Sequence, residues 1–596
     1  MEIDELGAAF RKPSSSMTMD DFAVTAGTTL ASDQSMTDPV PGLAPELPLS
    51  AAQLGIWYAI KAGTSASAFS IAEYTRIFGS VDKALFETAL RQLISEVEVL
   101  RLRFFESDGA VRQRVAEPDE WRLSYFDVTQ EADPLRSAET WMQADAAQPV
   151  SVEQWPLFGF ALFKLRTNEF LWFFRSHHLT MDGYSGQVVT RRLAEIYSSL
   201  SQGQISRIEQ LGSLRALIGE DVTYRQSASF ESDREFWLGA LNDCPEPPLL
   251  SVRAAPMSEE VLNRAVEICP PMMVRLRDFA RRADLTFPQL ITLATVTLIH
   301  RLTGAEDLVI GQFMTARMSP IARATPAMAT NLVPLRFSVR SDMPVGAVAE
   351  QVRRQTRAAL RRQRYRIADI RRDLRCVDRP IARQICSVRP FPDSAQFAGA
   401  RTTNHPVRNG PVEDVNIYVV YDESGQGACR LEFDANPNLY NAEELERLQR
   451  RYLQLLSALD DVHEFVGRLD ILPPEERQLI LESGIGPEPT IHGNVASTSC
   501  LRRRRNARRI GSRRVSGAAG SHTESWARRR TSWLSICQSS GSAPMTASPC
   551  TSNVRWTCLW RYWEFSRREP ATSRSIRTIP ERVWNSSWRI VARASC

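Results

Sequence analysis

Long apolar runs and an export signal are both missing from this chain. Its 596 residues contain no run of 18 consecutive apolar residues, so the sequence predicts no membrane-spanning helix. Residues 1–46 are rich in Ser, Thr, Pro and Asp and lack the apolar core of a signal peptide, so we interpret them as a disordered leader. Without an export signal we expect a cytoplasmic protein with reduced cysteines and no membrane partner.

Lysine and aspartate are missing from the last part of the chain. From Asn494 to Cys596 there are 20 Arg and 4 Glu but no Lys and no Asp, so this tail carries +16 while the whole chain carries +4. Arginine runs such as RRRR at 502–505 favour a basic arm that binds nucleic-acid phosphates. An excess of Arg, Trp, Cys and Ser without Lys or Asp is also typical of a GC-rich gene translated in a wrong reading frame. We prefer this second interpretation and expect no nucleic-acid partner.

Histidines are few, seven in all, yet two are adjacent in the segment 176–183, which reads SHHLTMDG. The segment follows an apolar run at 170–174 that predicts a strand. A neutral imidazole can take a proton from an attacking amine or hydroxyl near pH 7, so the pattern favours acyl-transfer chemistry. A simpler alternative is a structural role, in which a histidine lies in the core with its hydrogen bonds made by neighbouring groups. Metal binding by His178 and Asp182 is another, but no third ligand cluster is evident, so we expect no metal.

Helical and strand patterns alternate between residues 47 and 473, which indicates an α/β class. The predicted helices span residues 82–100, 186–200, 287–302 and 441–459, the last capped by Asn441. The predicted strands span residues 308–314, 332–339, 416–421 and 429–433. About 430 residues exceed one usual core, so we expect two lobes, residues 47–215 and 216–473, followed by a linker at 474–493.

Several segments, in the expected order, resemble motifs of nonribosomal peptide synthetase condensation domains. They are LSAAQLGIW at 49–57, VEVLRLRF at 97–104, HHLTMDG at 177–183, VIG at 309–311 with Arg317 after it, and TNLVPLR at 330–336. The segment 383–392 fits the last family motif poorly. GPVED at 410–414 adds a likeness to the domains that open the serine-activating enterobactin-type and related catechol-siderophore synthetases.

The resemblance implies two chloramphenicol-acetyltransferase-like lobes in a V shape, with a tunnel between them. For the residues that match the family's motif, the resemblance implies that His178 is the catalytic histidine. It also implies that Gly183 offers a backbone N–H to the developing oxyanion. His177 has a structural role, and Asp182 pairs with Arg317 to shape the loop. The substrate-tunnel candidates that remain are Tyr184, Ser185 and Asn331.

The resemblance also implies an amide-forming enzyme of siderophore biosynthesis. The donor is an acyl or aryl thioester on an upstream aryl or peptidyl carrier protein, and the acceptor is the amino group of an amino acid on a downstream carrier protein. The chain binds no cofactor of its own, because the phosphopantetheine arms of these carriers hold the substrates. The alternative is a truncated scaffold that binds carriers without turnover.

The tail fits this family in one respect. Plausible codons for residues 569–580, read one nucleotide earlier, spell GTGYLPLDPDYP, which resembles an early motif of adenylation domains. We therefore interpret residues 494–596 as an unstructured, frameshifted remnant of an adenylation domain.

Overall fold

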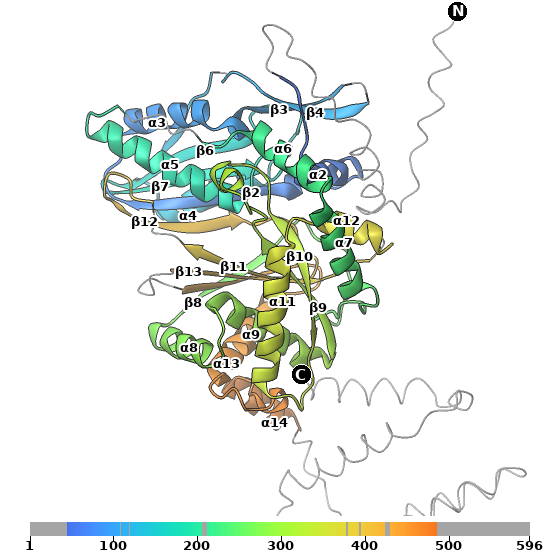
Figure 1. Cartoon of the computed structure of the whole chain (residues 1–596). Coiled ribbons are helices and arrows are strands. Elements are labelled where there is room, and N and C mark those ends of the chain that lie inside the picture. Colours follow the sequence, from blue (N-terminus) through green and yellow to red (C-terminus); the bar gives the residue numbers. More distant parts are fainter. Residues whose placement is uncertain are drawn as a thin grey trace, which may run out of the picture. The chain divides into compact units, whose positions relative to one another are not determined.

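The computed structural model describes residues 45–107, 109–118, 120–205, 211–376, 379–391, 395–422 and 429–484 (Figure 1). Two compact units are distinguished, residues 1–473 and 474–596. The second is described only over helix α14 (Pro474–Gly484), which occupies the start of the predicted linker. The predicted tail, and all but the end of the predicted leader, lie outside the described residues. No helix in the described ranges is long and apolar enough to cross a membrane.

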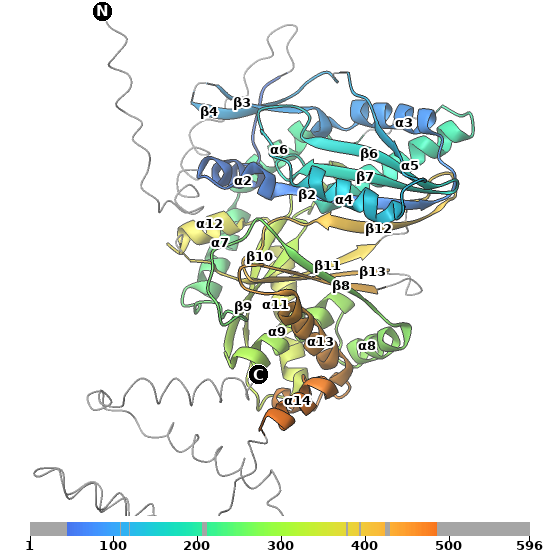
Figure 2. The ribbon, with the colours of Figure 1, turned by 180° about the vertical axis from the view of Figure 1, so that it is seen from behind.

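A five-stranded sheet organises the first part of unit 1, in the order β12-β2-β7-β6-β5. Its strands are β2 (Ser70–Phe78), β5 (Ser124–Asp127), β6 (Phe158–Arg166), β7 (Glu169–His177) and β12 (Arg401–Arg408). One face packs with α3 (Lys83–Glu96) and α5 (Gly183–Ser201) around a large apolar core, and α4 (Pro134–Ala146) packs on a smaller cluster (Figure 2). A three-stranded sheet of β1 (Leu47–Pro48), β3 (Leu102–Ser107) and β4 (Ala110–Val115) lies beside α2 (Ala51–Lys61).

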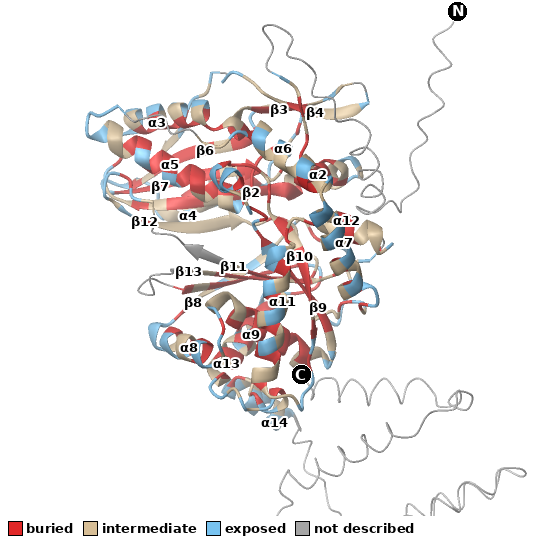
Figure 3. Cartoon of the chain, in the orientation of Figure 1, coloured by how far each residue is buried: buried red, intermediate tan, exposed pale blue. Residues whose placement is uncertain are grey.

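A six-stranded mixed sheet organises the second part, in the order β10-β9-β11-β13-β14-β8. Its strands are β8 (Leu262–Ile268), β9 (Asp307–Met314), β10 (Asn331–Ser338), β11 (Gln384–Phe391), β13 (Val415–Asp422) and β14 (Cys429–Ala435). The core includes α8 (Pro270–Arg282), α9 (Phe287–Thr303), α11 (Val345–Arg361) and α13 (Ala442–Ala458). Helix α9 is buried from Leu290 to His300, which explains its nearly unbroken apolar sequence (Figure 3).

Shorter helices connect these layers: α6 (Leu214–Arg225), α7 (Ala228–Leu241), α10 (Pro320–Ala324) and α12 (Ile367–Asp373). The four predicted helices and the five predicted strands, including the apolar run at 170–174, are all confirmed, with ends shifted by a few residues. The largest difference is at 82–100, where α3 ends at Glu96 and a separate 3₁₀ turn (Glu98–Arg101) follows. Asn441 caps α13 as predicted.

One strand crosses between the two sheets. β12 follows β11 in the chain, yet it pairs antiparallel with β2 at the edge of the first sheet. This pairing covers the backbone groups that β2 would otherwise expose. As a result, the segment from Pro406 to Gly410 lies at the edge of the first sheet.

Candidate functional site

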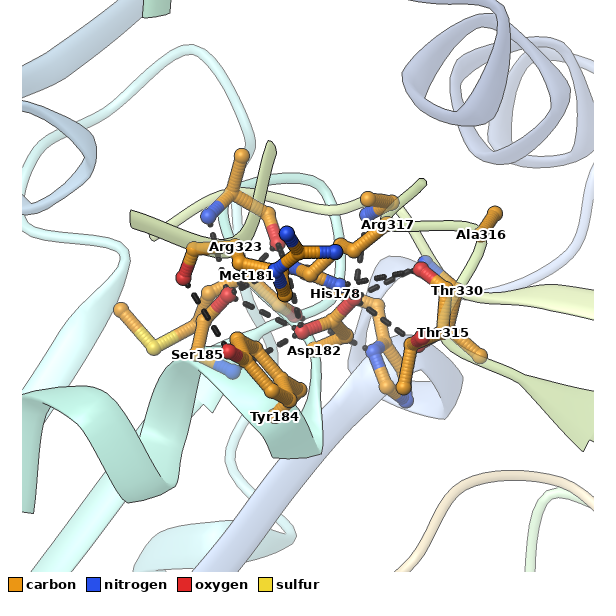
Figure 4. Close-up of polar contacts among 12 residues, drawn as sticks. His178, Met181, Asp182, Tyr184, Ser185, Thr315, Ala316, Arg317, Arg323 and Thr330 are labelled. Atoms are coloured by element: carbon orange, nitrogen blue, oxygen red, sulfur yellow. Dashed lines mark hydrogen bonds and ion pairs between the residues drawn. The ribbon is translucent and has the colours of Figure 1, made fainter. Parts of the chain in front are cut away.

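The His-His segment lies where β7 ends and α5 begins. β7 ends at His177, a short loop follows, and Asp182 caps the first turn of α5, which starts at Gly183. Side-chain capping is what the sequence favours here, because Asp accepts hydrogen bonds from first-turn N–H groups. The segment is therefore a strand-to-helix turn, and Figure 4 shows its residues His178, Met181 and Asp182 close together.

His177 is buried and hydrogen-bonded on both sides of its ring. Its Nδ1 accepts from the Leu179 N–H at 3.0 Å, so Nε2 carries the proton and donates to the Ala66 carbonyl at 2.9 Å. Burial lowers the pKa of His177 to about 4. The imidazole is thus held neutral between two backbone groups, which supports the structural role predicted for it.

His178 faces a cavity. Its backbone N–H donates to the Phe69 carbonyl at 2.8 Å, and its ring Nδ1 lies 3.2 Å from the Met181 carbonyl oxygen. A carbonyl can only accept, so Nδ1 carries the proton and Nε2 keeps its lone pair in the neutral ring. A Cβ placed on Gly410 would lie 4.0 Å from that Nε2. The basic nitrogen therefore points toward the cavity between the His loop and Gly410.

Asp182 joins the His loop to the second part of the chain (Figure 4). Its carboxylate accepts from Arg317 at 2.7 and 3.1 Å, with both side chains about 1% exposed. It also accepts from the Ser185 hydroxyl and from the backbone N–H groups of Ala329 and Thr330. The predicted pairing of these two residues is present in the structure, and the buried ion pair links the His loop to the segment that carries Arg317.

The pKa of Asp182 follows from this environment. Burial alone would raise it, but the Arg317 charge and the hydrogen bonds outweigh burial and hold the pKa of the carboxyl well below its usual range. Asp182 is therefore ionised near neutral pH, which suits a structural ion pair with Arg317.

The other predicted residues occupy different places. Gly183 lines the cavity, and a Cβ on it would meet nothing within 4 Å. Tyr184 also lines the cavity, and its ring lies 4.5 Å from the Arg317 guanidinium carbon. Ser185 is fully buried, with its Oγ accepting from the Arg317 guanidinium at 2.8 Å and from the Ala327 N–H at 2.9 Å, so it belongs to the Asp182 network. Asn331 lines the cavity while its amide donates to the Gln363 and Tyr365 carbonyls at 2.9 and 2.8 Å.

The cavity has a volume of about 780 Å³ and is lined from both sheets of unit 1. Its lining includes three residues that the sequence analysis did not propose for the site, Glu73, Gly186 and Arg366, and Gly410 lies between the lining residues Asn409 and Pro411. Successive residues of a strand point to opposite faces of the sheet, and a charged residue at a position expected to face inward is unusual. This signal could have indicated Glu73. The place of the other residues in the cavity depends on contacts between segments that are distant in the sequence. Arg366, for example, donates to the Ala329 carbonyl at 2.7 Å, on the loop that binds Asp182.

A metal centre is not supported in the described ranges. No three His, Cys, Asp or Glu side chains there are grouped to hold a metal ion. The Asp182 carboxylate already accepts from Arg317 and from backbone N–H groups, so the pairing of His178 with Asp182 as ligands finds no support in the geometry.

Comparison with known proteins gives a consistent result. A family model described as Condensation domain matches residues 44–481. The "Dimodular nonribosomal peptide synthase" of Bacillus subtilis (strain 168) is 36% identical over 439 residues, which cover 73% of this chain and 18% of that protein. The "Isonitrile lipopeptide synthase" of Streptomyces coeruleorubidus is 34% identical, covering 69% and 28%. "Enterobactin synthase component F" of Escherichia coli O157:H7 is 28% identical, covering 76% and 35%.

Solved structures are also similar. The starter condensation domain of rhizomide synthetase, a double mutant in complex with C8-CoA and Leu-SNAC, superposes with a TM-score of 0.67 at 34% identity and covers 72% of this chain and 98% of that one. The first condensation domain of the calcium-dependent antibiotic synthetase gives a TM-score of 0.67 at 26% identity, covering 71% and 98%. The chain thus spans about a fifth to a third of the curated relatives, but nearly the whole of these structures.

Proposed function

The chain belongs to the condensation-domain family of nonribosomal peptide synthetases, and we propose that it joins a carrier-bound acyl donor to the amino group of a carrier-bound amino acid at His178. Condensation domains are amide-forming acyltransferases with the two-lobe fold seen here. The observation that carries the proposal is the orientation of His178, whose basic Nε2 faces a cavity lined from both sheets.

The proposed chemistry needs one proton acceptor. The α-amino nitrogen attacks the thioester carbonyl carbon, a C–N bond forms and the C–S bond breaks. His178 Nε2 hydrogen-bonds the amine or takes its proton, and that proton ends on the leaving thiolate of the donor arm. The Met181 carbonyl fixes the ring in the tautomer that this role requires, and it stabilises the protonated ring as well.

We propose that the first turn of α5 stabilises the oxyanion. Gly183 is the first residue of the helix, and the N–H groups of a first turn have no intrahelical acceptor. The positive end of the helix dipole adds to this preference for negative charge. With no side chain on Gly183, the thioester oxygen can approach the backbone closely. Gly183 is thus proposed to bind the oxyanion, while Asp182 and Arg317 hold the turn in place.

We propose carrier proteins as partners, one on the donor side and one on the acceptor side, each bringing its substrate on a phosphopantetheine arm. For the donor we propose an acyl group without an α-amino group, of the kind that starts a chain. A starter condensation domain in complex with C8-CoA among the similar structures supports this. Similarity to "Enterobactin synthase component F" supports an aryl donor and a siderophore product.

The test is a reconstituted assay with two carriers. One carrier is charged with a 2,3-dihydroxybenzoyl or an octanoyl group and the other with serine or leucine, and the acceptor is analysed by intact-protein mass spectrometry. We expect the acceptor to gain the mass of one acyl group when the chain is present. No mass gain with any charged pair would contradict the proposal.

A further inference from the structure

We propose that Arg366 is a positioning residue for the reaction: it holds the peptide group that donates to Asp182, and so it fixes the turn that carries His178. Arg366 lies between α11 and α12, in the second part of unit 1, and it lines the cavity. Its guanidinium acts through the loop at 329–330 and not on the substrate. This inference rests on the proposed function and adds a residue on which the reaction depends.

One peptide group joins Arg366 to Asp182. The Nη1 of Arg366 donates to the Ala329 carbonyl at 2.7 Å, and the Thr330 N–H donates to Asp182 Oδ2 at 2.8 Å. That carbonyl and that N–H belong to the same peptide group, so the guanidinium binds one end of it and the carboxylate binds the other. Hydrogen bonds in such a chain polarise and strengthen one another, so the cation makes the Thr330 N–H a better donor to Asp182.

Further contacts hold the same loop from both sides. The Nη1 of Arg366 also donates to the Thr330 carbonyl at 3.1 Å. Asp182 Oδ2 accepts from the Ala329 N–H at 3.0 Å and from the Thr330 hydroxyl at 2.8 Å. The loop at 329–330 therefore lies between a cation and an anion, and removal of the cation would let it shift relative to Asp182.

Asn331 fixes the backbone on both sides of Arg366. Its side-chain amide donates to the Tyr365 carbonyl at 2.8 Å, and its Oδ1 accepts from the Ile367 N–H at 3.2 Å. Asn331 directly follows Thr330 in the chain, so these bonds join the segment 365–367 to the loop at 329–330. The loop that Arg366 binds therefore also sets the position of Arg366.

The hydrogen bonds of the Arg366 guanidinium support this loop. Asp369 pairs with Arg225 and with Arg372, at 2.8 Å in each case. The Nε of Arg366 is buried and has no hydrogen-bond partner among the described residues. Burial lowers the pKa of Arg366 and the Asp221 carboxylate opposes this, but an arginine keeps its proton in proteins. A partly buried charge is costly unless hydrogen bonds compensate it, which the two carbonyls do.

Variants of the full chain at Arg366 test the proposal. Arg366→Gln keeps a neutral amide donor but removes the charge, and Arg366→Lys keeps the charge. Arg364→Gln is the matched control, because Arg364 lies two residues away and donates to the Glu220 carbonyl at 2.8 Å instead. Thermal unfolding shows whether each variant is folded.

The two-carrier assay separates positioning from substrate binding. We expect Arg366→Gln to lower kcat at least about tenfold, the size of one hydrogen bond to a charged group, and to leave the KM for both carriers unchanged. Arg366→Lys should recover part of this loss, and Arg364→Gln should match the unaltered chain. A raised KM with an unchanged kcat would make Arg366 a substrate-binding residue and would overturn the inference.

Nuclear magnetic resonance gives a second readout that needs no turnover. The chain is labelled with ¹⁵N in threonine and histidine, and the two signals of interest are assigned by their loss in Thr330→Ser and His178→Ala. We expect Arg366→Gln to move the Thr330 amide proton upfield and to reduce the fraction of His178 that is protonated at Nδ1. Arg364→Gln should change neither signal.

Unchanged Thr330 and His178 signals in Arg366→Gln would overturn the inference, and so would a kcat within a factor of two of the unaltered chain. If Arg366→Gln does not fold, Arg366→Lys decides. A compact ammonium group polarises a carbonyl differently from a planar guanidinium, so the Thr330 signal should still move, and an unmoved signal would overturn the inference. The proposed function fails separately, through the absence of amide product from the unaltered chain.

Discussion

The Nδ1 of His178 lies 3.2 Å from the backbone carbonyl oxygen of Met181, three residues further along the same turn. The acceptor is a backbone atom, so the conformation of the turn determines which tautomer this contact favours. That conformation in turn depends on Asp182, which caps α5 and is held by Arg317. Asp182 therefore supports both the orientation of the His178 ring and the contact with Arg317 in the second part of the chain.

The Asp182–Arg317 pair should be essential for stability. Arg317→Ala leaves a buried carboxylate without its counter-charge, and removing one partner of such a pair costs about 3–5 kcal/mol. We expect the free energy of unfolding, measured by urea denaturation at pH 7, to fall by that amount. Arg281→Ala removes an arginine with a 79% exposed side chain and is the matched control, with a change below about 0.5 kcal/mol. A loss below about 1 kcal/mol for Arg317→Ala would contradict the account.

His177 should make the fold sensitive to mild acid. Burial lowers its pKa to about 4 from an ordinary value of 6.5, so below pH 6.5 the unfolded chain binds a proton that the folded chain does not. Its contribution to stability is fully present above pH 6.5 and is lost as the pH falls toward 4, by roughly 1.4 kcal/mol per pH unit. His177→Asn should reduce the slope of unfolding free energy against pH between 6.5 and 4.5.

Exposed His463 offers the control for that experiment. His463→Asn should keep the slope of the unaltered chain, because it has no buried environment to lose. Part of the slope should also survive in His177→Asn, since burial lowers the pKa of His405 to about 4 too. An identical slope in His177→Asn and the unaltered chain would show that His177 does not remain neutral in the fold.

Gly183→Ala should separate folding from catalysis. The added methyl group would meet nothing within 4 Å, so we expect the free energy of unfolding to change by less than about 1 kcal/mol. The methyl group would project into the space proposed for the thioester, and displacing the reacting group by an ångström can lower kcat/KM about a hundredfold. Gly239→Ala in α7, with equally open space, is the control that should leave kcat/KM unchanged. Full activity in Gly183→Ala would remove Gly183 from the proposed site.

Local patterns were sufficient to predict the regular elements. The apolar periodicities of α9 and α13, and the apolar runs of β9, β10, β13 and β14, depend on neighbours in the chain, and each was predicted within a few residues. The turn from β7 to α5 could be predicted as a site because its adjacent histidines, Asp182 and Gly183 lie within one short segment of the sequence. The pairing of Asp182 with Arg317, 135 residues away, came from family resemblance.

Long-range pairing could not be predicted in the same way. The sequence of β12, RTTNHPVR, is polar and contains Pro406, so it has no pattern typical of a strand, and its structure depends on the exposed edge of β2. Ser185 was predicted to face the substrate and is instead buried against Ala327, because the position of the Ala327 loop is set by contacts far away in the chain. Glu73 was not predicted to line the cavity, because its place there depends on α5 facing it.

The most direct test of the central claim is the rate of amide formation by His178→Ala in the two-carrier assay. The acceptor carrier is sampled over time by intact-protein mass spectrometry, and exposed His463→Ala is measured in parallel. The account predicts that His178→Ala lowers the rate at least about a hundredfold, the lower range for removing a general base, and that it folds normally and binds both carriers. His463→Ala should match the unaltered chain. A rate for His178→Ala within a factor of two of the unaltered chain would contradict the account.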